Sequence, residues 1–209
     1  YLPNFFKGVE TLTFIPYARP GGISHDDYTK TVATAFAKIE IKVVGLHTFN
    51  NPKEGLKKAE AIFVGGGNTF LLVNQLYQLE LMQSLRQKIE IGTPYLGTSA
   101  GSNIAGVSMK TTNDMPIIHP PSFDTLGVVP FNLNPHYLDP DPKSNHNGET
   151  RETRIAEFHC INNTPVIGLR EGSFITVQEG ETILHGPHTA RVFKKGQQPF
   201  EMEPRSIVL

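Results

Sequence analysis

The chain has 209 residues and a formal net charge of −1, without a long run of like charges, which argues against a clustered basic face for nucleic acid. Cys160 is the only cysteine, so the sequence excludes a disulfide framework and a cysteine-based zinc site, and it fits a reducing compartment. No apolar run approaches the ~18–20 residues of a membrane span and no signal peptide is visible, so we expect a cytoplasmic protein without membrane contact.

Strand-like and helix-like segments alternate along the first half of the chain. Apolar runs predict strands at 11–16, 42–46, 61–64 and 93–96. Apolar residues at helical spacing predict helices over 26–39, 68–76 and 79–89. Continuous apolar runs suit strands that are covered on both faces, so this alternation predicts an α/β fold with a doubly wound, mostly parallel sheet.

The second half of the chain has a different pattern. The run 128–131 is strand-like, a short helix is predicted over 149–158, and a further strand over 165–169. Two hairpin signals follow, which predict antiparallel strands added at the C-terminal end: 173–178 with 181–184, and 191–193 with 200–202.

No linker divides two apolar halves, so residues 1–209 are expected to form a single catalytic domain. The sequence opens at Tyr1 without a methionine and without a preceding apolar strand. We therefore expect an N-terminal strand to be missing from it.

The segment 97–101, Gly-Thr-Ser-Ala-Gly, has the pattern G-x-S-x-G. It lies between the predicted strand 93–96 and a run that can begin a helix, which is the context of a nucleophile elbow. The two glycines allow a sharp turn, and the helix N-terminus after Ser99 offers free N–H groups to an oxyanion. The alternative is a strand-helix turn in which Ser99 only caps the helix.

A nucleophilic serine needs a base and an acid. His136 follows a strand-like run and Pro135, at a place where sheet enzymes carry catalytic groups; the alternative is a loop histidine that bonds to backbone. An α/β-hydrolase order would instead require His185 or His188, which lie in a turn-like segment.

The acid is left open by the residues themselves, with five candidates: Asp114, Asp124, Asp139, Asp141 and Glu171. Glu171 lies just beyond the predicted strand 165–169, whereas Asp124 can equally cap a helix or a turn.

The segment 65–68, Gly-Gly-Gly-Asn, follows a predicted strand and opens a helix. It lacks G-x-G-x-x-G and the lysine of a P-loop, so nucleotide binding is weakly supported. Three interpretations remain: an anion cradle, a glycine N–H that joins the N–H of Ala100 in an oxyanion hole, and a tight turn capped by Asn68. The sequence has no H-E-x-x-H and scattered histidines, so we expect no metal site.

Several motifs taken together resemble peptidase E, the aspartyl dipeptidase family. They occur in this order: 64–70, 97–103, 111–116, 134–136, 148–151 and 171–172. The resemblance runs from about Phe14 to Phe193. It implies a serine peptidase on a flavodoxin-like, glutamine-amidotransferase-like sheet, which hydrolyses dipeptides with an N-terminal aspartate and uses no cofactor or metal.

The same resemblance assigns roles to residues. It implies Ser99 as the nucleophile, His136 as the base and Glu171 as the acid, with Asp124 as a competing acid. Its oxyanion hole is similar to a pair formed by Gly67 and Ala100.

The resemblance also places Arg151 where it can bind the aspartate side chain of the substrate. The alternative for Arg151 is a solvated ion pair with Glu149 or Glu152. Two competing functions are a related serine hydrolase, such as an esterase or an acidic-polymer peptidase, and a non-catalytic protein that binds a small anion. An oligomer is possible on this sequence, which does not set the oligomeric state.

Overall fold

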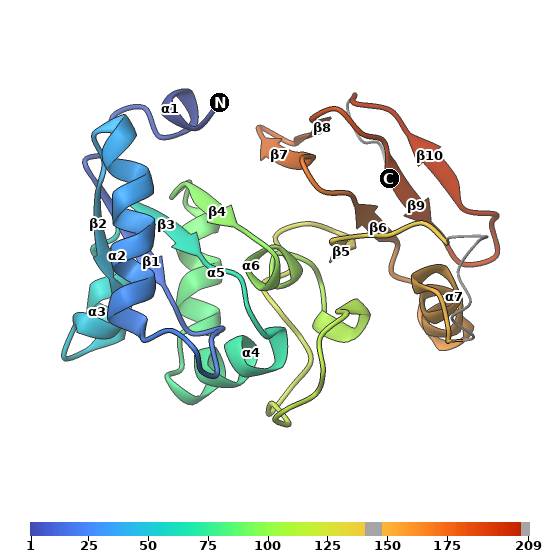
Figure 1. Cartoon of the computed structure of the whole chain (residues 1–209), viewed down its shortest axis with the longest axis horizontal. Helices are drawn as coiled ribbons and strands as arrows, with labels where there is room; N and C mark the ends of the chain where they lie inside the picture. Colours follow the sequence, from blue (N-terminus) through green and yellow to red (C-terminus); the bar gives the residue numbers. More distant parts are fainter. Residues whose placement is uncertain (141–147, 206–209) are drawn as a thin grey trace.

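The structure is a computed structural model that describes residues 1–140 and 148–205. Its strands form three hydrogen-bonded groups: a four-stranded sheet with the order β2-β1-β3-β4, a four-stranded sheet with the order β10-β9-β6-β5, and the hairpin β7-β8 (Figure 1). The strands are β1 (Thr11–Ile15), β2 (Lys42–Gly45), β3 (Ala61–Val64), β4 (Tyr95–Gly97), β5 (Asn132–Pro135), β6 (Val166–Leu169), β7 (Phe174–Gln178), β8 (Glu181–His185), β9 (Ala190–Phe193) and β10 (Phe200–Met202).

All pairings in the first sheet are parallel, and their order is that of the first four strands of a flavodoxin-like sheet. The helices of the described chain are α1 (Leu2–Phe5), α2 (His25–Phe36), α3 (Pro52–Lys57), α4 (Thr69–Gln78), α5 (Met82–Glu90), α6 (Ala100–Asn103) and α7 (Arg151–Ile161). Three 3₁₀ turns accompany them: η1 (Ala37–Ile39), η2 (Leu46–Thr48) and η3 (Met109–Thr111).

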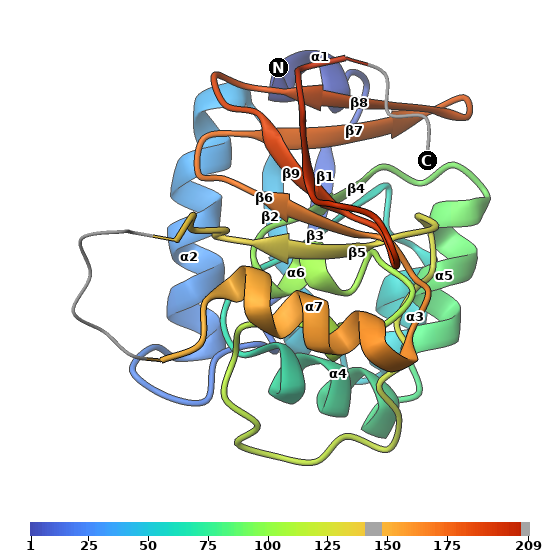
Figure 2. The ribbon, with the colours of Figure 1, turned by 90° about the vertical axis from the view of Figure 1, so that its right-hand side faces the viewer.

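Helices cover both faces of the first sheet. On one face α2 buries Val32 and Phe36 against Phe14 and Phe63, and on the other α3, α4 and α5 pack on a separate cluster (Figure 2). Every residue of β3 is buried, as expected for a strand between two neighbours and two helical layers. The predicted doubly wound parallel sheet is therefore confirmed.

The second sheet combines both strand directions. β5 and β6 are parallel, β9 runs antiparallel to β6, and β10 runs antiparallel to β9. β7 and β8 form a separate antiparallel hairpin. The prediction of antiparallel strands in the C-terminal part is confirmed.

The expectation of a strand over 128–131 is wrong. The strand β5 begins at Asn132, after Pro130, which has no N–H for a ladder. Asn132 and Asn134 are buried despite their polarity because their amides are bonded: Asn132 Oδ1 accepts from the Ser108 N–H at 2.9 Å, and Asn134 Nδ2 donates to the Thr111 carbonyl at 2.7 Å. Apolar periodicity does not detect such a strand.

The predicted helix over 26–39 is shorter in the structure. α2 ends at Phe36 and continues as η1, and its Ser24 cap accepts from the Asp27 N–H at 3.0 Å. The short helices α1 and α3 were not predicted. Within the described ranges, no helix is long and apolar enough to cross a membrane.

Candidate active site

Ser99 lies on the sharp turn between β4 and α6. Its backbone has φ 52° and ψ −109°, a conformation that costs a non-glycine residue free energy and recurs at functional sites. A Cβ atom on Gly101 would lie 2.2 Å from the Val64 carbonyl oxygen, so the helix passes the neighbouring strand at a distance that only glycine permits. The predicted G-x-S-x-G turn is thus present with its strand and its helix.

The glycine loop after β3 lies against this turn. A Cβ atom on Gly66 would be 3.0 Å from the Cβ of Ser99. Gly67 has φ 144°, and a Cβ there would lie 2.3 Å from the Ala18 carbonyl oxygen, so a side chain does not fit. Asn68 caps α4 by accepting from the Leu71 N–H at 3.1 Å, so the capped-turn interpretation also holds.

Tyr28 fixes the direction of one peptide in that loop. Its hydroxyl donates to the Gly66 carbonyl at 3.3 Å. In a trans peptide the carbonyl of Gly66 and the N–H of Gly67 point in opposite directions. The Gly67 N–H therefore points away from Tyr28. Among residues 1–140 and 148–205, neither this N–H nor that of Ala100 has a recorded acceptor.

His136 and Glu171 follow two neighbouring parallel strands. Pro135 of β5 is paired with Leu169 of β6, which places the residues just beyond them side by side. His136 Nδ1 contacts a Glu171 carboxylate oxygen. Because the carboxylate accepts only, Nδ1 carries the proton in this contact, and Nε2 is left as an acceptor. His136 has φ 56°, a second left-handed backbone at this site.

A cavity of about 320 Å³ joins these elements. Its lining includes Ser99 from the first sheet, His136 from the end of β5, and Arg151 from the start of α7. The segments that carry the candidate nucleophile, base and cation are far apart in the sequence, and the fold brings them to one opening.

Arg151 lies at this cavity without a partner among the acidic residues that the structure describes. Glu149 pairs instead with Arg154, and Glu152 with Arg191. Arg151 donates to the Pro135 carbonyl at 3.4 Å. Burial and the neighbouring Arg154 lower the pKa of its guanidinium, which nevertheless stays protonated at neutral pH. The expected alternative, a surface pair with Glu149 or Glu152, is wrong for the described part of the chain.

Asp124 is placed elsewhere. Its segment forms an isolated bridge with Ser108, and its carbonyl accepts from the Tyr77 hydroxyl at 3.0 Å. It is not part of the cavity lining, and Glu171, not Asp124, contacts His136. The candidate Asp139 is bonded to Arg170. The candidate Asp141 lies outside the described residues.

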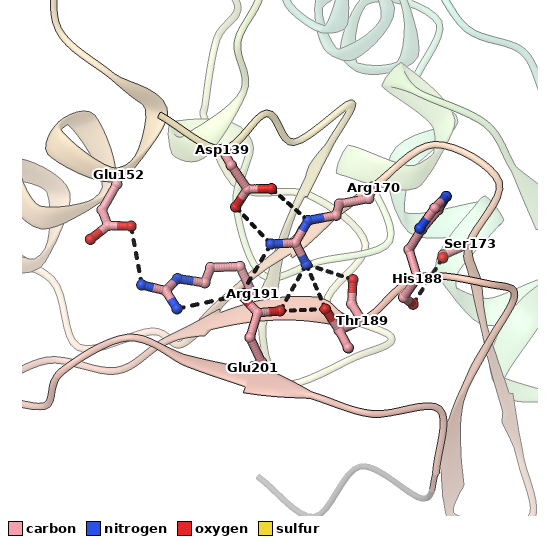
Figure 3. A network of polar contacts seen from close by, with 8 residues as sticks. All are labelled: Asp139, Glu152, Arg170, Ser173, His188, Thr189, Arg191 and Glu201. Atoms are coloured by element: carbon pink, nitrogen blue, oxygen red, sulfur yellow. Dashed lines mark hydrogen bonds and ion pairs between the residues drawn. The ribbon is translucent and has the colours of Figure 1, made fainter. Parts of the chain in front are cut away.

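Arg170, the residue before Glu171, belongs to a cluster of charged residues (Figure 3). Arg170 donates two bonds to Asp139, at 2.7 and 2.9 Å, and also bonds to Glu201 and to Thr189. The hydrogen bonds that Arg170 donates to Glu201 and Asp139 raise the pKa of its guanidinium, and Arg170 in turn lowers the pKa of Glu201 to about 2. The cluster ties β6 to β10 and to the segment after His136.

Four further polar residues line the cavity: Asn103, Thr112, Asn113 and Asp114. Sequence reasoning had considered only Asp114, as one of five possible acids. The motif over 111–116 contained the signal for three of them, but their shared position depends on tertiary contacts. Across the described ranges, no group of three histidine, cysteine or acidic residues is placed to hold a metal ion.

A serine on a strand-helix elbow, in one cavity with a histidine that contacts a carboxylate, is the arrangement of a serine hydrolase. The class of protein that this fold and this arrangement define is therefore a serine hydrolase on an α/β fold.

The chain belongs to peptidase family S51, whose family model matches residues 1–185. It is 50% identical over 199 residues to a Streptomyces coelicolor protein named Peptidase E, covering 95% of this chain and 81% of that protein. It is 47% identical over 206 residues to a Drosophila melanogaster protein named probable alpha-aspartyl dipeptidase, covering 97% of this chain and 85% of that protein.

Solved structures share the fold. A putative peptidase E protein from Listeria monocytogenes aligns with a TM-score of 0.69 at 22% identity, over 89% of this chain and 91% of that one. A peptidase from an acI-B1 actinobacterium aligns with a TM-score of 0.73 at 15% identity, over 99% of this chain and 89% of that one. The comparisons establish a peptidase of family S51 on this fold.

Proposed function

We propose that the protein is a cytoplasmic dipeptidase that hydrolyses dipeptides with an N-terminal aspartate through Ser99, His136 and Glu171. The observation that carries this proposal is the cavity lined by Ser99, His136 and Arg151, together with the contact between His136 and Glu171. Membership of family S51 and the names of the relatives support the peptidase chemistry and the choice of substrate.

In the first half of the reaction, His136 Nε2 takes the proton of the Ser99 hydroxyl as its oxygen attacks the scissile carbonyl carbon. The carbonyl electrons move to the oxygen, and the N–H groups of Gly67 and Ala100 hold the resulting anion. When the carbonyl reforms, the carbon–nitrogen bond breaks and His136 gives its proton to the leaving amine.

In the second half, water attacks the aspartyl ester on Ser99. His136 again takes a proton, now from the water, and returns it to the Ser99 oxygen as the ester breaks. Glu171 keeps Nδ1 protonated and stabilises the imidazolium in both halves. The products are free aspartate and the second amino acid, and no cofactor takes part.

Arg151 accounts for the choice of substrate. A carboxylate that leaves water for a cavity needs a cation, and a guanidinium can bind it with two parallel hydrogen bonds. Since Arg151 is held by the Pro135 carbonyl rather than by a carboxylate of the described chain, it is available for the aspartate side chain.

The proposal is tested by incubating four dipeptides with the protein and with its Ser99→Ala variant: Asp-X, Glu-X, Asn-X and Leu-X. We expect hydrolysis of Asp-X alone at high rate, and the loss of nearly all of it in the variant, because alanine removes the nucleophile and fits the turn. A fluorophosphonate should label the wild type and not the variant. Equal turnover by Ser99→Ala would refute the assignment; labelling without Asp-X hydrolysis would favour an esterase or an acidic-polymer peptidase.

A further inference from the structure

The strained backbone of Ser99 needs contacts that hold it in place. A residue with φ 52° and ψ −109° persists only where the surrounding structure imposes that conformation. The helix that follows, α6, has four residues, and a single helical turn gains too little to hold such a residue by itself. The motif glycines Gly97 and Gly101 flank the serine, and glycine has the backbone that rotates most freely. The elbow therefore depends on contacts that cross it.

Tyr95 provides one such contact from the strand. It lies in β4, and its hydroxyl donates to the Gly101 carbonyl at 2.6 Å. In a longer α-helix the Ala105 N–H would bond to this carbonyl, but it bonds to the Ser102 carbonyl at 3.1 Å instead. Burial raises the pKa of the Tyr95 hydroxyl, which therefore remains a donor at neutral pH and well above it.

Ser102 provides the matching contact from the helix. Its hydroxyl donates to the Gly97 carbonyl at 2.9 Å. Each of the two bonds joins the strand before Ser99 to the helix after it, and they run in opposite directions along the chain. The carbonyls of both motif glycines are thus held by a side-chain hydroxyl.

The close packing of the glycines has a different effect. A Cβ atom on Gly97 would lie 2.5 Å from the Gly101 carbonyl oxygen, and one on Gly101 would lie 2.2 Å from the Val64 carbonyl oxygen. These distances exclude side chains and let the strand and the helix approach each other, but a steric limit does not select the direction of a peptide. A hydrogen bond selects it, because the bond weakens steeply as donor and acceptor lose their alignment.

We propose that the hydroxyls of Tyr95 and Ser102 are positioning groups for the nucleophile. By holding the two glycine carbonyls, they keep Ser99 in its strained conformation at the cavity that it shares with His136. Neither Tyr95 nor Ser102 is among the described residues that line this cavity, so they act through Ser99 rather than by touching the substrate. This inference rests on the proposed function, in which Ser99 is the nucleophile.

The first test is Tyr95→Phe, which removes one hydroxyl and keeps the ring. A misplacement of about 1 Å at a reacting group can cost ~10²-fold in rate, so kcat for Asp-X and the rate constant of fluorophosphonate labelling should both fall by roughly 10- to 100-fold. KM should change by less than a few-fold, because the cavity lining is intact. Tyr77→Phe is the matched control and should keep both rates, since the Tyr77 hydroxyl also donates to a carbonyl, that of Asp124 at 3.0 Å, but outside the cavity.

The extent of labelling separates positioning from a loss of folded protein. A misplaced nucleophile reacts slowly, whereas a partly unfolded variant labels fewer sites with the wild-type rate constant. A lowered rate constant in Tyr95→Phe would support the proposal, and the wild-type rate constant, with fewer sites labelled or not, would overturn it. Labelling does not require a dipeptide, so this comparison holds even if Asp-X is not the substrate. A wild type that is not labelled at all would reject Ser99 as the nucleophile, and the proposed function with it.

The second test uses Ser102, where a variant should fold well. Alanine has a higher helix propensity than serine, so Ser102→Ala should change the free energy of unfolding little, as measured by urea denaturation, and yet slow labelling and kcat several-fold. Ser102→Thr retains a hydroxyl and should recover most of the lost rate. Equal rate constants in Ser102→Ala and the wild type would overturn the assignment of Ser102 as a positioning residue.

Discussion

The two sheets hold their candidate catalytic residues in different ways. In the first sheet, backbone packing determines the place of Ser99: Gly101 passes the Val64 carbonyl at a distance that excludes a side chain, and Gly67 passes Ala18 in the same way. In the second sheet, side-chain polar contacts connect the site: Glu171 contacts His136, and Arg170, next to Glu171, pairs with Asp139 and Glu201. The first region should therefore be sensitive to added volume, and the second to lost charge.

The largest effect is expected from charge loss in the second region. Glu171→Gln keeps the shape of the side chain but no longer stabilises the imidazolium, so kcat should fall by ~10²–10⁴, as in other triads. Asp124→Asn is the matched control and should change kcat by less than a few-fold, because Asp124 does not line the cavity. The reverse ranking of the two variants would show that Asp124 is the acid.

Arg151→Met extends the test to the substrate's charge. It should reduce kcat/KM for Asp-X by ~2–5 kcal/mol of transition-state binding, because the variant leaves a buried carboxylate unpaired. The preference for Asp-X over Asn-X should shrink with it. Steady-state kinetics of both substrates with both proteins decide the matter: an unchanged Asp/Asn ratio would mean that another group recognises the charge.

Added volume tests the first region. Gly101→Ala places a methyl group 2.2 Å from the Val64 carbonyl oxygen, so strand and helix have to separate. We expect a loss of about 1–3 kcal/mol in the free energy of unfolding, measured by urea denaturation, together with lower activity. Gly21→Ala is the control, since a Cβ there meets no atom within 4 Å. A stable, fully active Gly101→Ala would contradict the packing argument.

The smallest effect concerns the pH dependence of stability. Arg170 lowers the pKa of Glu201 from 4.5 to about 2, so this pair stabilises the fold above about pH 4.5 and the contribution is lost as the pH falls towards 2. Glu201→Gln should reduce the change in the free energy of unfolding between about pH 4.5 and pH 2. The reduction should be less than ~1 kcal/mol, because solvent screens a partly exposed pair. Denaturation curves at several pH values measure it; an unaltered slope would exclude the linkage.

The sequence predicted most of the first region because its signals are local. Apolar runs marked the strands, and the glycines around Ser99 and before Asn68 marked two turns that are present in the structure. The rule about strand ends favoured His136 and left Glu171 as one of five candidate acids, from which the resemblance to peptidase E selected it. Each of these inferences needs only a few consecutive residues.

The second region was harder because its elements depend on distant partners. The strand β5 is buried through amides that bond to Ser108 and Thr111, which no periodicity indicates. The alternative considered for Arg151 was an ion pair with a sequence neighbour, yet Glu152 pairs with Arg191, a residue from another strand. The grouping of Asn103, Thr112 and Asp114 likewise arises only when the chain is folded.

The hydrogen bonds that Arg170 donates to Thr189 and Glu201 have a consequence for the protein during its synthesis. A ribosome synthesises the chain from the N-terminus at roughly 5–20 residues per second. Ser99 is therefore synthesised roughly 5–20 s before the last strand, β10. The first sheet and the elbow can assemble in that interval, while Arg170, which precedes the candidate acid Glu171, still lacks two of its anchors. The nascent chain thus completes the elbow around Ser99 early, and the contacts that anchor Arg170 beside Glu171 are complete only after β10 has been translated.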